Sequence, residues 1–526
     1  MKTTIPSKKS SQKRSIATAF LCLGLILSPA ITSPMSYLRS MASGLGTSLR
    51  NNKVATLVAT SSALGFMYNY QVAQAYMPLT WDWSTLDYQT PQTFPEGFLW
   101  GTATSAHQVE GNCTNNTWSA WEKATDETGK SRVESPSGEA CDHWNLYKSD
   151  IQAMKKLGVN SYRFSIEWSK VEPQEGTFDE TALQHYEDVC QELINNGIQP
   201  CITLHHYTDP LWFMDKYGFE KSENIACYVH YTTAVIKRLH KFNPLWFTFN
   251  SPDGYAAQGY LTCTKPAGRL VPKKDMQLCA EVYKNLLEAH VQTYHAIKNE
   301  PKYKTARIGI LKNMLQLDPH NPYNPLDRLA CSMGKKIVDT CFFDYFTKGN
   351  FKVYIPFKAD MNHTNAQAIG ALDFVGVNYY SHGCMKNFKV VRFEGEETTN
   401  NERYTIYAEG LYRAIKEMSD CVAKPLGIPL YVTENGIATT DENQRDRFFK
   451  KYLFALSKAI KDGYNVKGYM YWSLLDNYEW GCYKKKYGIY HVDFDTQERT
   501  LKPGSQFYLD TIAKNTTSSN DESKND

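Results

Sequence analysis

Apolar residues follow two alternating kinds of spacing between residues 94 and 513. In residues 142–158, DHWNLYKSDIQAMKKLG, apolar side chains recur with the period of a helix, and Gly158 is suited to end it. Residues 160–166, NSYRFSI, read as a buried strand. The same succession recurs in residues 180–206, where a helical stretch ends at Gly197 before QPCITLHH. The pattern therefore predicts a repeated unit of strand and helix.

Eight strands of this kind are predicted, each separated from the next by helical sequence. They lie in FLWGTAT (98–104), NSYRFSI (160–166), QPCITLHH (199–206), PLWFTFN (244–250), ARIGILKN (306–313), ALDFVGVNYY (371–380), PLYVTENG (429–436) and VKGYMYWSLLDN (466–477). Eight such units over about 420 residues favour an α/β fold with a single (β/α)8 TIM barrel and extended loops. An open, doubly wound sheet is the competing architecture, but none of the strands is followed by its Gly-rich turn, G-x-G-x-x-G.

The first 81 residues have a different composition, with eight basic residues, no acidic residue and two apolar runs at 17–31 and 54–67. Each run is short for a membrane span and has the length of a signal-peptide core. The second run is followed by VAQA, an A-x-A cleavage pattern. We expect residues 1–75 to be a targeting leader, either a signal or a transit peptide and in one or two parts. Residues 76–91 are expected to be a linker before a barrel over residues 92–514.

The leader leaves the destination of the protein open. It suits the secretory pathway or export, and its acid-poor, Ser- and Arg-bearing composition also suits import into an organelle. An uncleaved anchor is the alternative to cleavage, and in that case the leader is the one part expected to contact a membrane. At the other end, residues 515–526, NTTSSNDESKND, lack apolar side chains and are predicted to be disordered.

Charge and cysteine content exclude several functions. The formal charge is +3, but the leader contributes eight basic residues, so the remainder of the chain has a charge of −5. A mildly acidic protein is not expected to bind nucleic acid. The 13 cysteines lack the paired C-x-x-C spacing of a zinc site, and we expect neither a metal nor a cofactor. In an exported chain Cys113/Cys141 and Cys263/Cys279 are candidate disulfides, and otherwise the cysteines are small core residues.

Polar and aromatic residues gather at the ends of the predicted strands, where barrel enzymes carry their function. These positions hold Gln108, Glu110, Arg163, Glu167, His205, His206, Tyr207, Asn250, Ser251, Asn378, Tyr379, Tyr380, Glu434, Asn435, Trp472, Asp476, Glu479 and Trp480. Aromatic rings cover the apolar C–H face of a pyranose, while amides and carboxylates bind its hydroxyl groups. Each residue alone also fits a packing role, but their convergence indicates a site for a sugar.

Seven motifs, in order, resemble those of the family 1 glycoside hydrolases, the β-glucosidase family. They are FPEGFLWGTATSAHQVEGN, YRFSIEWSKVEP, TLHHYTDPLWF, WFTFN, DFVGVNYYS, YVTENG and YWSLLDNYEW, and the resemblance covers roughly residues 92 to 512. It implies that Glu434 of YVTENG is the nucleophile that forms a covalent glycosyl-enzyme. It also implies that Arg163 and Tyr380 flank this carboxylate and keep it ionised and oriented.

The resemblance further implies a subsite for a β-linked sugar. The residues that match its hydroxyl-binding and stacking positions are Gln108, His206, Asn250, Glu479, Trp472 and Trp480. Asn250 is expected on the 2-hydroxyl group, and the two tryptophans are expected to stack on the ring. The lysines after Trp480, in GCYKKKYG, are similar to the phosphate-binding loop of 6-phospho-β-glycosidases, but Glu479 would repel a phosphate, so a neutral sugar is favoured.

One position departs from the family pattern. The family's Asn-Glu-Pro motif supplies the general acid/base, and here the triplet is Asn250-Ser251-Pro252. A retaining glycosidase uses two carboxyl groups, and a serine hydroxyl does not ionise near neutral pH. General acid–base assistance typically contributes about 10²–10⁴-fold in rate, so a loss of that order is expected for ordinary glycosides. Rescue by Asp253 is an alternative.

Two functions follow from this pattern. The first is a retaining β-glycosidase that is slowed or specialised by Ser251, acting on leaving groups that depart without a proton or through an external acceptor. The second is a glycosidase-like pseudoenzyme that binds a glycan or a protein. The retained nucleophile and sugar subsite favour the enzyme.

Overall fold

The computed structural model describes residues 53–267, 273–400 and 404–522. The chain forms two compact units. The larger comprises residues 80–316, 336–382 and 395–526, and the smaller comprises residues 1–79, 317–335 and 383–394.

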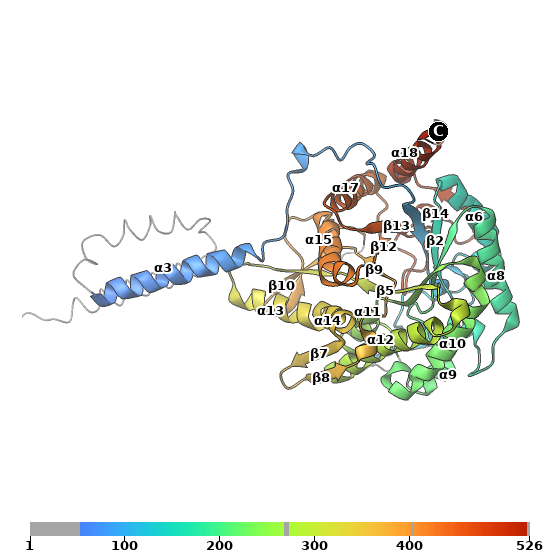
Figure 1. The fold of residues 1–526 in the computed structure, drawn as a ribbon, viewed down its shortest axis with the longest axis horizontal. Helices are drawn as coiled ribbons and strands as arrows, with labels where there is room; N and C mark the ends of the chain where they lie inside the picture. The colour runs from blue at the N-terminus through green and yellow to red at the C-terminus, as the bar shows by residue number, and fades with distance from the viewer. Residues whose placement is uncertain (1–52, 268–272, 401–403, 523–526) are drawn as a thin grey trace, which may run out of the picture. The chain divides into compact units, whose positions relative to one another are not determined.

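Eight parallel strands close into a barrel in the larger unit (Figure 1). The order around the barrel is β1-β13-β12-β9-β5-β4-β3-β2, so each barrel strand pairs with the next one along the chain and the last pairs with the first. The strands are β1 (Leu99–Ala103), β2 (Ser161–Ser165), β3 (Gln199–Thr203), β4 (Leu245–Asn250), β5 (Arg307–Asn313), β9 (Phe374–Asn378), β12 (Leu430–Asn435) and β13 (Val466–Trp472). Each falls within a predicted segment, and the predicted (β/α)8 barrel is confirmed.

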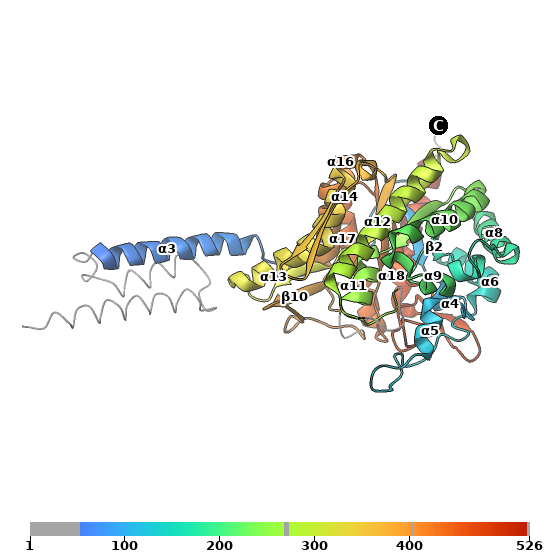
Figure 2. The same ribbon diagram turned by 90° about the horizontal axis from the view of Figure 1, so that it is seen from below.

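Long helices surround the strands, as Figures 1 and 2 show. They are α6 (His143–Leu157), α8 (Glu180–Asn195), α10 (Ile225–Leu239), α12 (Met276–Lys298), α14 (Cys341–Lys348), α15 (Glu409–Met418), α17 (Glu442–Lys461) and α18 (Gln506–Glu522). Helix α6 illustrates how the sequence specifies them. Its buried face includes Ile151, Met154 and Leu157 at helical spacing, and Gly158 ends it with a left-handed φ of 78°.

Shorter elements occupy the connections. The helices among them are α4 (Ala106–Val109), α5 (Thr117–Lys123), α7 (Trp168–Val171), α9 (Leu211–Asp215), α11 (Pro252–Tyr260) and α16 (Lys424–Leu426). The strands among them form two antiparallel pairs, β7 (Asn350–Ile355) with β8 (Ala359–Thr364) and β14 (Tyr490–Val492) with β15 (Arg499–Leu501).

Alternation along each strand separates two cores. In β4, Leu245 and Phe247 belong to one hydrophobic cluster, while Trp246 between them belongs to another that also contains apolar residues of the helices. Successive strand residues point to opposite faces, so the first cluster fills the barrel and the second seals the helices onto it. The register shifts near Asn250 on β4 and near Glu434 on β12, which re-aims side chains where these two strands end.

The predicted linker, residues 76–91, is packed against the barrel from residue 80 onward. The backbone N–H of Trp81 and the indole N–H of Trp83 both donate to Glu409 Oε1, at 3.0 and 2.9 Å. Both rings also lie edge-on against Phe454. Trp81 and Trp83 carry enough apolar surface to hold this stretch against the barrel. The prediction of a linker therefore holds at most for residues 76–79.

The chain end also differs from prediction. Helix α18 continues to Glu522, into the segment predicted to be disordered from residue 515. Asn515, the first residue of that segment, is anchored to the chain before the barrel. Its side chain accepts from the Phe94 N–H at 2.7 Å and donates to the Gln92 carbonyl at 3.0 Å. Once a helix is nucleated, each added residue costs little, which permits a polar extension. Residues 523–526 lie outside the described chain.

The smaller unit contains α3 (Lys53–Gln74), α13 (Pro325–Lys335) and the sheet β11-β10-β6. Its strands are β6 (Gln316–Pro319), β10 (His382–Lys386) and β11 (Lys389–Val391). The second apolar run of the leader lies on α3, and the first run lies outside the described residues. Within the described ranges, no helix combines the length and the hydropathy that a membrane crossing requires. Cleavage near Ala75 stays a prediction.

Cys113, Cys141, Cys263 and Cys279 are free thiols in the structure. The two candidate disulfides, Cys113/Cys141 and Cys263/Cys279, are therefore not formed. Cys22 lies outside the described residues.

Candidate active site

A cavity opens where the barrel strands end. Its empty space is about 590 Å³ when the open mouth is included. Its lining consists of His206, Tyr207, Asn250, Ser251, Gln258, Lys265, Asn313, Asn378, Tyr380, Tyr404, Glu434, Trp472, Glu479, Trp480 and Tyr487. All but two of the ten predicted site residues lie on this wall. The exceptions, Arg163 and Gln108, lie behind it and hold residues that do.

The carboxylate of Glu434, at the end of β12, is held by both oxygens. Arg163 Nη1 donates to Oε1 at 2.6 Å, and the Tyr380 hydroxyl donates to Oε2 at 2.7 Å. Arg163 is fully buried and is itself fixed by Thr203, whose hydroxyl accepts from Nε at 3.0 Å. Burial and then the charge of Glu434 raise the pKa of Tyr380, so its hydroxyl keeps its proton. The predicted flanking of Glu434 by these two residues matches the geometry.

A row of hydrogen bonds connects Glu434 to Ser251 across the floor of the cavity. Arg163 Nη2 donates to Asn250 Oδ1 at 2.9 Å, and Asn378 Nδ2 donates to the same oxygen at 2.8 Å. Asn378 Nδ2 also donates to Ser251 Oγ at 3.1 Å. Glu434 and Ser251 therefore belong to one connected site rather than to opposite sides of the barrel mouth.

Another part of the predicted sugar subsite surrounds Glu479. Gln108 donates to Glu479 Oε2 at 3.1 Å and Trp472 donates to the same oxygen at 3.4 Å. Burial raises the pKa of Glu479 and lowers that of His206, which favours a neutral imidazole. The His206 ring stacks on Trp472 and on Trp480, with centroids 5.6 and 5.9 Å apart. The arrangement offers carboxylate, imidazole and indole groups to one ligand.

Ser251 occupies a strained backbone position between β4 and α11. Its φ of 44° lies in the left-handed region that favours glycine, and its N–H donates to the Leu311 carbonyl at 3.0 Å. Among the described residues that line the cavity, only Glu434 and Glu479 carry carboxyl groups. No described lining residue thus supplies a second carboxyl group beside Ser251.

Two residues of the cavity lining were missed or undervalued in the sequence. Tyr207 lines the cavity together with Ser251, although the sequence marked it only as one of many strand-end residues. Lys265 also lines the cavity, and nothing in the motifs around it signalled that. Only the adjacency of Tyr207 to His206 in TLHHYTDPLWF could have drawn attention to the first.

The interpretation of Asp253 as a substitute acid is not supported by its surroundings. Its Oδ2 lies 3.0 Å from Lys312 Nζ, and Lys312 also contacts Asp339 at 2.9 Å. All three groups are buried, and Asp253 does not line the cavity. Asp253 is therefore tied to Lys312 outside the cavity lining, where it does not meet a bound sugar.

Asp339→Asn is expected to change how stability depends on pH. One ammonium between two carboxylates leaves a buried negative charge, and burial raises the pKa of Asp339 to about 6. The folded protein therefore keeps this proton up to a higher pH than the unfolded chain does. The stability that protonated Asp339 contributes is lost as the pH rises from about 4 to about 6. Relative to the native protein, the free energy of unfolding of the variant should rise by about 2 kcal/mol between pH 4.5 and pH 7.5.

Urea unfolding of both proteins at pH 4.5 and 7.5 measures this gain. Asp344→Asn, which removes a partly exposed carboxylate paired with Lys348, is the matched control and should show little pH-dependent difference. If the difference in unfolding free energy between Asp339→Asn and the native protein were the same at both pH values, the raised pKa of Asp339 would be contradicted.

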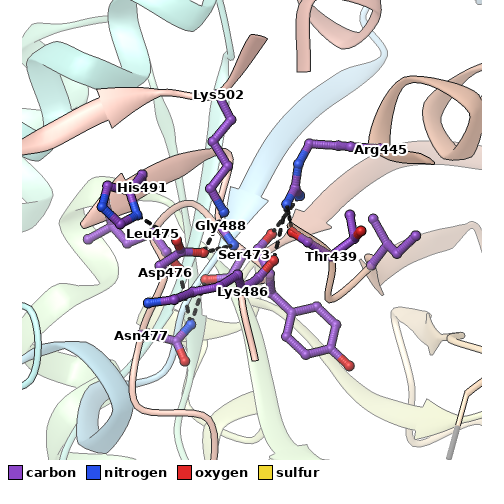
Figure 3. Close-up of polar contacts among 12 residues, drawn as sticks. Thr439, Arg445, Ser473, Leu475, Asp476, Asn477, Lys486, Gly488, His491 and Lys502 are labelled. Carbon is purple, nitrogen blue, oxygen red and sulfur yellow. Dashed lines mark hydrogen bonds and ion pairs between the residues drawn. The ribbon is translucent and has the colours of Figure 1, made fainter. Parts of the chain in front are cut away.

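Other strand-end acids serve the scaffold. Asp476 accepts from Lys502 at 2.7 Å and from the Gly488 N–H at 2.8 Å, as Figure 3 shows. Burial, then the nearby Arg445, lowers the pKa of Lys502 to about 8. Arg445 donates to the Lys486 and Thr439 carbonyls at 3.1 and 2.7 Å. This cluster fixes the segment that carries Glu479 and Trp480.

Glu110 and Glu167 likewise lie outside the cavity lining. Glu110 binds Lys170 at 2.9 Å and accepts from Tyr186 at 2.8 Å. Glu167 accepts from Ser169 at 2.6 Å.

One group of described side chains consists of residue types that bind metals, but its potential ligand atoms already take part in other interactions. Potential ligand atoms of His107, Cys113 and Glu167 lie within 4.8 Å of one another. His107 hydrogen-bonds through both ring nitrogens, to Glu122 at 2.9 Å and Asn116 at 3.2 Å. Burial raises the pKa of the Cys113 thiol, which disfavours the thiolate that a metal requires. These residues pack behind the site and do not indicate a metal centre.

Comparisons with known proteins agree with this geometry. Residues 90–517 match the sequence model of glycosyl hydrolase family 1. Beta-glucosidase A of Acetivibrio thermocellus is 32% identical over 461 residues, covering 80% of this chain and 99% of that protein. Among solved structures, a beta-glycosidase from Pyrococcus horikoshii has a TM-score of 0.70 at 36% identity, covering 80% of this chain and 95% of that one. Beta-glucosidase from Thermotoga maritima in complex with castanospermine has a TM-score of 0.72 at 28% identity, with 80% and 99% covered.

Proposed function

Because the chain belongs to glycosyl hydrolase family 1, we propose that it is a retaining β-glycosidase of the β-glucosidase type that forms a covalent glycosyl-enzyme on Glu434. The observation that carries this proposal is the fixed carboxylate of Glu434, bound at one oxygen by Arg163 and at the other by Tyr380 inside a cavity lined by sugar-binding groups. Relatives in sequence from Acetivibrio thermocellus and Thermotoga maritima bear the name Beta-glucosidase A, which supports the substrate class.

In the first step, one oxygen of Glu434 bonds to the anomeric carbon while the bond from that carbon to the leaving group breaks. The electron pair of the broken bond goes to the leaving atom. A general acid would protonate that atom, but Ser251 cannot, and the raised pKa of Tyr207 makes its phenol a poor donor. The step should therefore favour leaving groups that are stable as anions.

In the second step, an acceptor displaces Glu434 from the anomeric carbon. Water needs a base to take its proton, and no described lining residue offers a carboxylate beside Ser251. The glycosyl-enzyme should consequently accumulate, or react with an acceptor that arrives already ionised. Asn250, His206 and Glu479 hold the sugar by its hydroxyl groups, while Trp472 and Trp480 cover its apolar face.

A burst of phenol tests the proposal. With 2,4-dinitrophenyl β-D-glucoside, one equivalent of dinitrophenol per protein should appear quickly and be followed by slow turnover, because the first step needs no acid and the second lacks a base. The substitution at Ser251 also favours a second candidate, a pseudoenzyme that binds a glycan or protein. Ligand binding with no burst would support that candidate.

Sodium azide is expected to accelerate turnover of the same substrate by about 10²-fold, within the range that acid–base assistance covers. Azide is a small anion that needs no deprotonation, and Ser251 leaves room where a glutamate would repel it. The product should be β-glucosyl azide, identified by NMR. Ser251→Gln, which fills the room with a neutral side chain, is the control and should respond weakly. An α-linked azide would exclude a glycosyl-enzyme intermediate.

A further inference from the structure

Exposed apolar side chains are concentrated in the smaller unit. The described chain has fourteen large hydrophobic side chains that are exposed, and eight of them belong to this unit, whose described residues are 53–79, 317–335 and 383–394. These eight are Leu64, Met67, Tyr68, Met77, Leu326, Leu329, Phe388 and Val390. Large exposed apolar patches mark surfaces that bind a protein or a membrane. A docking surface is therefore expected on the smaller unit.

Helix α3 has apolar residues on two faces. On one face, Phe66 is 4% exposed, and the ring centroids of Tyr70 and Tyr323 lie 6.1 Å apart. Asn69 Nδ2 also donates to the Tyr323 carbonyl at 3.1 Å, and the Tyr323 N–H donates to Asn321 Oδ1 at 2.9 Å. This face is packed within the unit. Residues at the spacing i, i+3 and i+4 form another face that is exposed, and they are Leu64, Met67 and Tyr68.

A buried carboxylate joins the start of helix α13 to the turn between β10 and β11. Asp327 Oδ1 accepts from the Asn387 N–H at 2.9 Å, and Oδ2 accepts from the Asn321 N–H at 3.1 Å. Leu326 precedes this aspartate and Phe388 follows Asn387, and their side chains are 53% and 52% exposed. Figures 1 and 2 both show α13 beside β10. The exposed apolar residues of the helix and of the hairpin therefore lie on neighbouring segments of the unit.

The exposed charge on these segments is mainly positive. In and directly after the hairpin, the exposed basic side chains are Lys386, Lys389 and Arg392. Asp318 and Asp327 are buried, so Glu394 is the one exposed acid in the described parts of the smaller unit. Basic side chains lay their aliphatic stems along an apolar surface while their charged ends reach polar groups. Residues 386–392 thus combine basic and apolar side chains on one exposed hairpin.

The formal charge of the whole unit has the same sign. Residues 1–79 contain eight basic residues and no acid, residues 317–335 are balanced, and residues 383–394 have an excess of two basic residues, which gives +10 for the unit. Because the chain as a whole has +3, the larger unit has −7. A second copy would bring like charges together at this surface. A bilayer with anionic headgroups offers the opposite charge together with an apolar interior.

We propose that the smaller unit binds the surface of a membrane that contains anionic lipids. The side chains that enter the boundary between headgroups and acyl chains include a set that we call the lipid patch, namely Leu326, Leu329, Phe388 and Val390. The neighbouring basic side chains bind the headgroups. The lipid patch lies in residues 317–335 and 383–394, so it remains with the barrel whether or not the leader is cleaved near Ala75. Membrane contact is therefore not confined to the leader, and it does not depend on chemistry at Glu434.

Sedimentation of the full chain with sucrose-loaded vesicles tests this surface. Partitioning to phosphatidylcholine vesicles that contain about 30% phosphatidylserine should exceed partitioning to phosphatidylcholine alone by about 10²-fold, and added salt should reduce the ratio. Phe388→Asn should lower partitioning to the anionic vesicles about tenfold, because a large apolar side chain no longer leaves water. Asparagine tolerates the left-handed φ of 63° at this position. Lys386→Gln combined with Lys389→Gln should lower the ratio between the two vesicles about tenfold.

The hairpin β7–β8 of the larger unit supplies matched controls. Phe357 is an exposed phenylalanine with a φ of 60°, and Lys352 and Lys358 are exposed lysines on either side of it. Phe357→Asn should leave partitioning to the anionic vesicles unchanged, and so should Lys352→Gln combined with Lys358→Gln.

Equal partitioning of the native protein to the two vesicles would overturn the inference, as would undiminished partitioning of Phe388→Asn or an equal loss in Phe357→Asn. Val390→Ser is a second variant, which should also weaken partitioning, and urea unfolding of both variants should match that of the native protein. Analytical ultracentrifugation without vesicles examines a second copy as the occupant. Self-association that Phe388→Asn abolishes, in a protein that does not bind vesicles, would assign the lipid patch to a dimer and overturn the inference.

Discussion

Ser251→Glu is expected to raise kcat/KM for methyl β-D-glucoside and other unactivated glucosides by about 10²–10⁴-fold, the usual contribution of a general acid/base. The new carboxyl group would stand at the start of α11, connected through Asn378 and Asn250 to the site that holds Glu434. Ser251 already bears a Cβ at a φ of 44°, so glutamate adds no new kind of backbone strain.

Rates for activated dinitrophenyl glucosides should change far less in the first step, since that leaving group needs no proton. Ser251→Gln is the matched control, because its amide has nearly the size of the glutamate side chain but no acidic proton. The pH profile of kcat/KM for Ser251→Glu should gain a limb from the titration of the new carboxyl group, and the glutamine variant should lack this limb. Equal rates for the two variants on methyl glucoside would place the acid/base position elsewhere.

Glu434→Gln should lower kcat/KM for dinitrophenyl β-D-glucoside by a factor on the order of 10⁴ or more, the scale seen when a nucleophile is removed from an enzyme. An amide is a poor nucleophile, and Arg163 would lose the charge that it binds at 2.6 Å. Stopped-flow measurement of phenol release should show no burst, and azide should restore no β-glucosyl azide.

Glu479→Gln is the matched control, because it neutralises the other carboxylate of the described cavity wall. Glu479 is expected to hold hydroxyl groups, so its substitution should raise KM while the burst persists. If Glu479→Gln abolished the burst and Glu434→Gln retained it, the roles of the two carboxylates would have to be exchanged.

The fold was predictable because it depends on local patterns. Each barrel strand is a short apolar segment between helical segments, and positions such as Gly158 mark where a helix ends. The docking of Trp81 and Trp83 was not predictable, because their partners Glu409 and Phe454 lie more than 300 residues away. Composition alone made this stretch resemble a linker.

The candidate site was predictable only where strands carry it. Arg163, Asn250 and Glu434 converge because parallel strands bring their ends to one rim. Lys265 follows the helix α11, in a connection whose course depends on tertiary packing, and its spacing from Tyr207 follows no period. Lys312 pairs with both Asp253 and Asp339, and the position of Asp339 likewise depends on tertiary packing that the sequence pattern does not reveal.

Mass spectrometry after incubation with 2,4-dinitrophenyl 2-deoxy-2-fluoro-β-D-glucoside tests most directly whether Glu434 forms the glycosyl-enzyme. The fluorine slows both steps, and the dinitrophenolate leaves without a proton. The missing base at position 251 lengthens the lifetime of the adduct further. The peptide that contains Glu434 should gain the mass of one fluoroglucosyl group. An unmodified protein, or a label on any residue other than Glu434, would contradict the account.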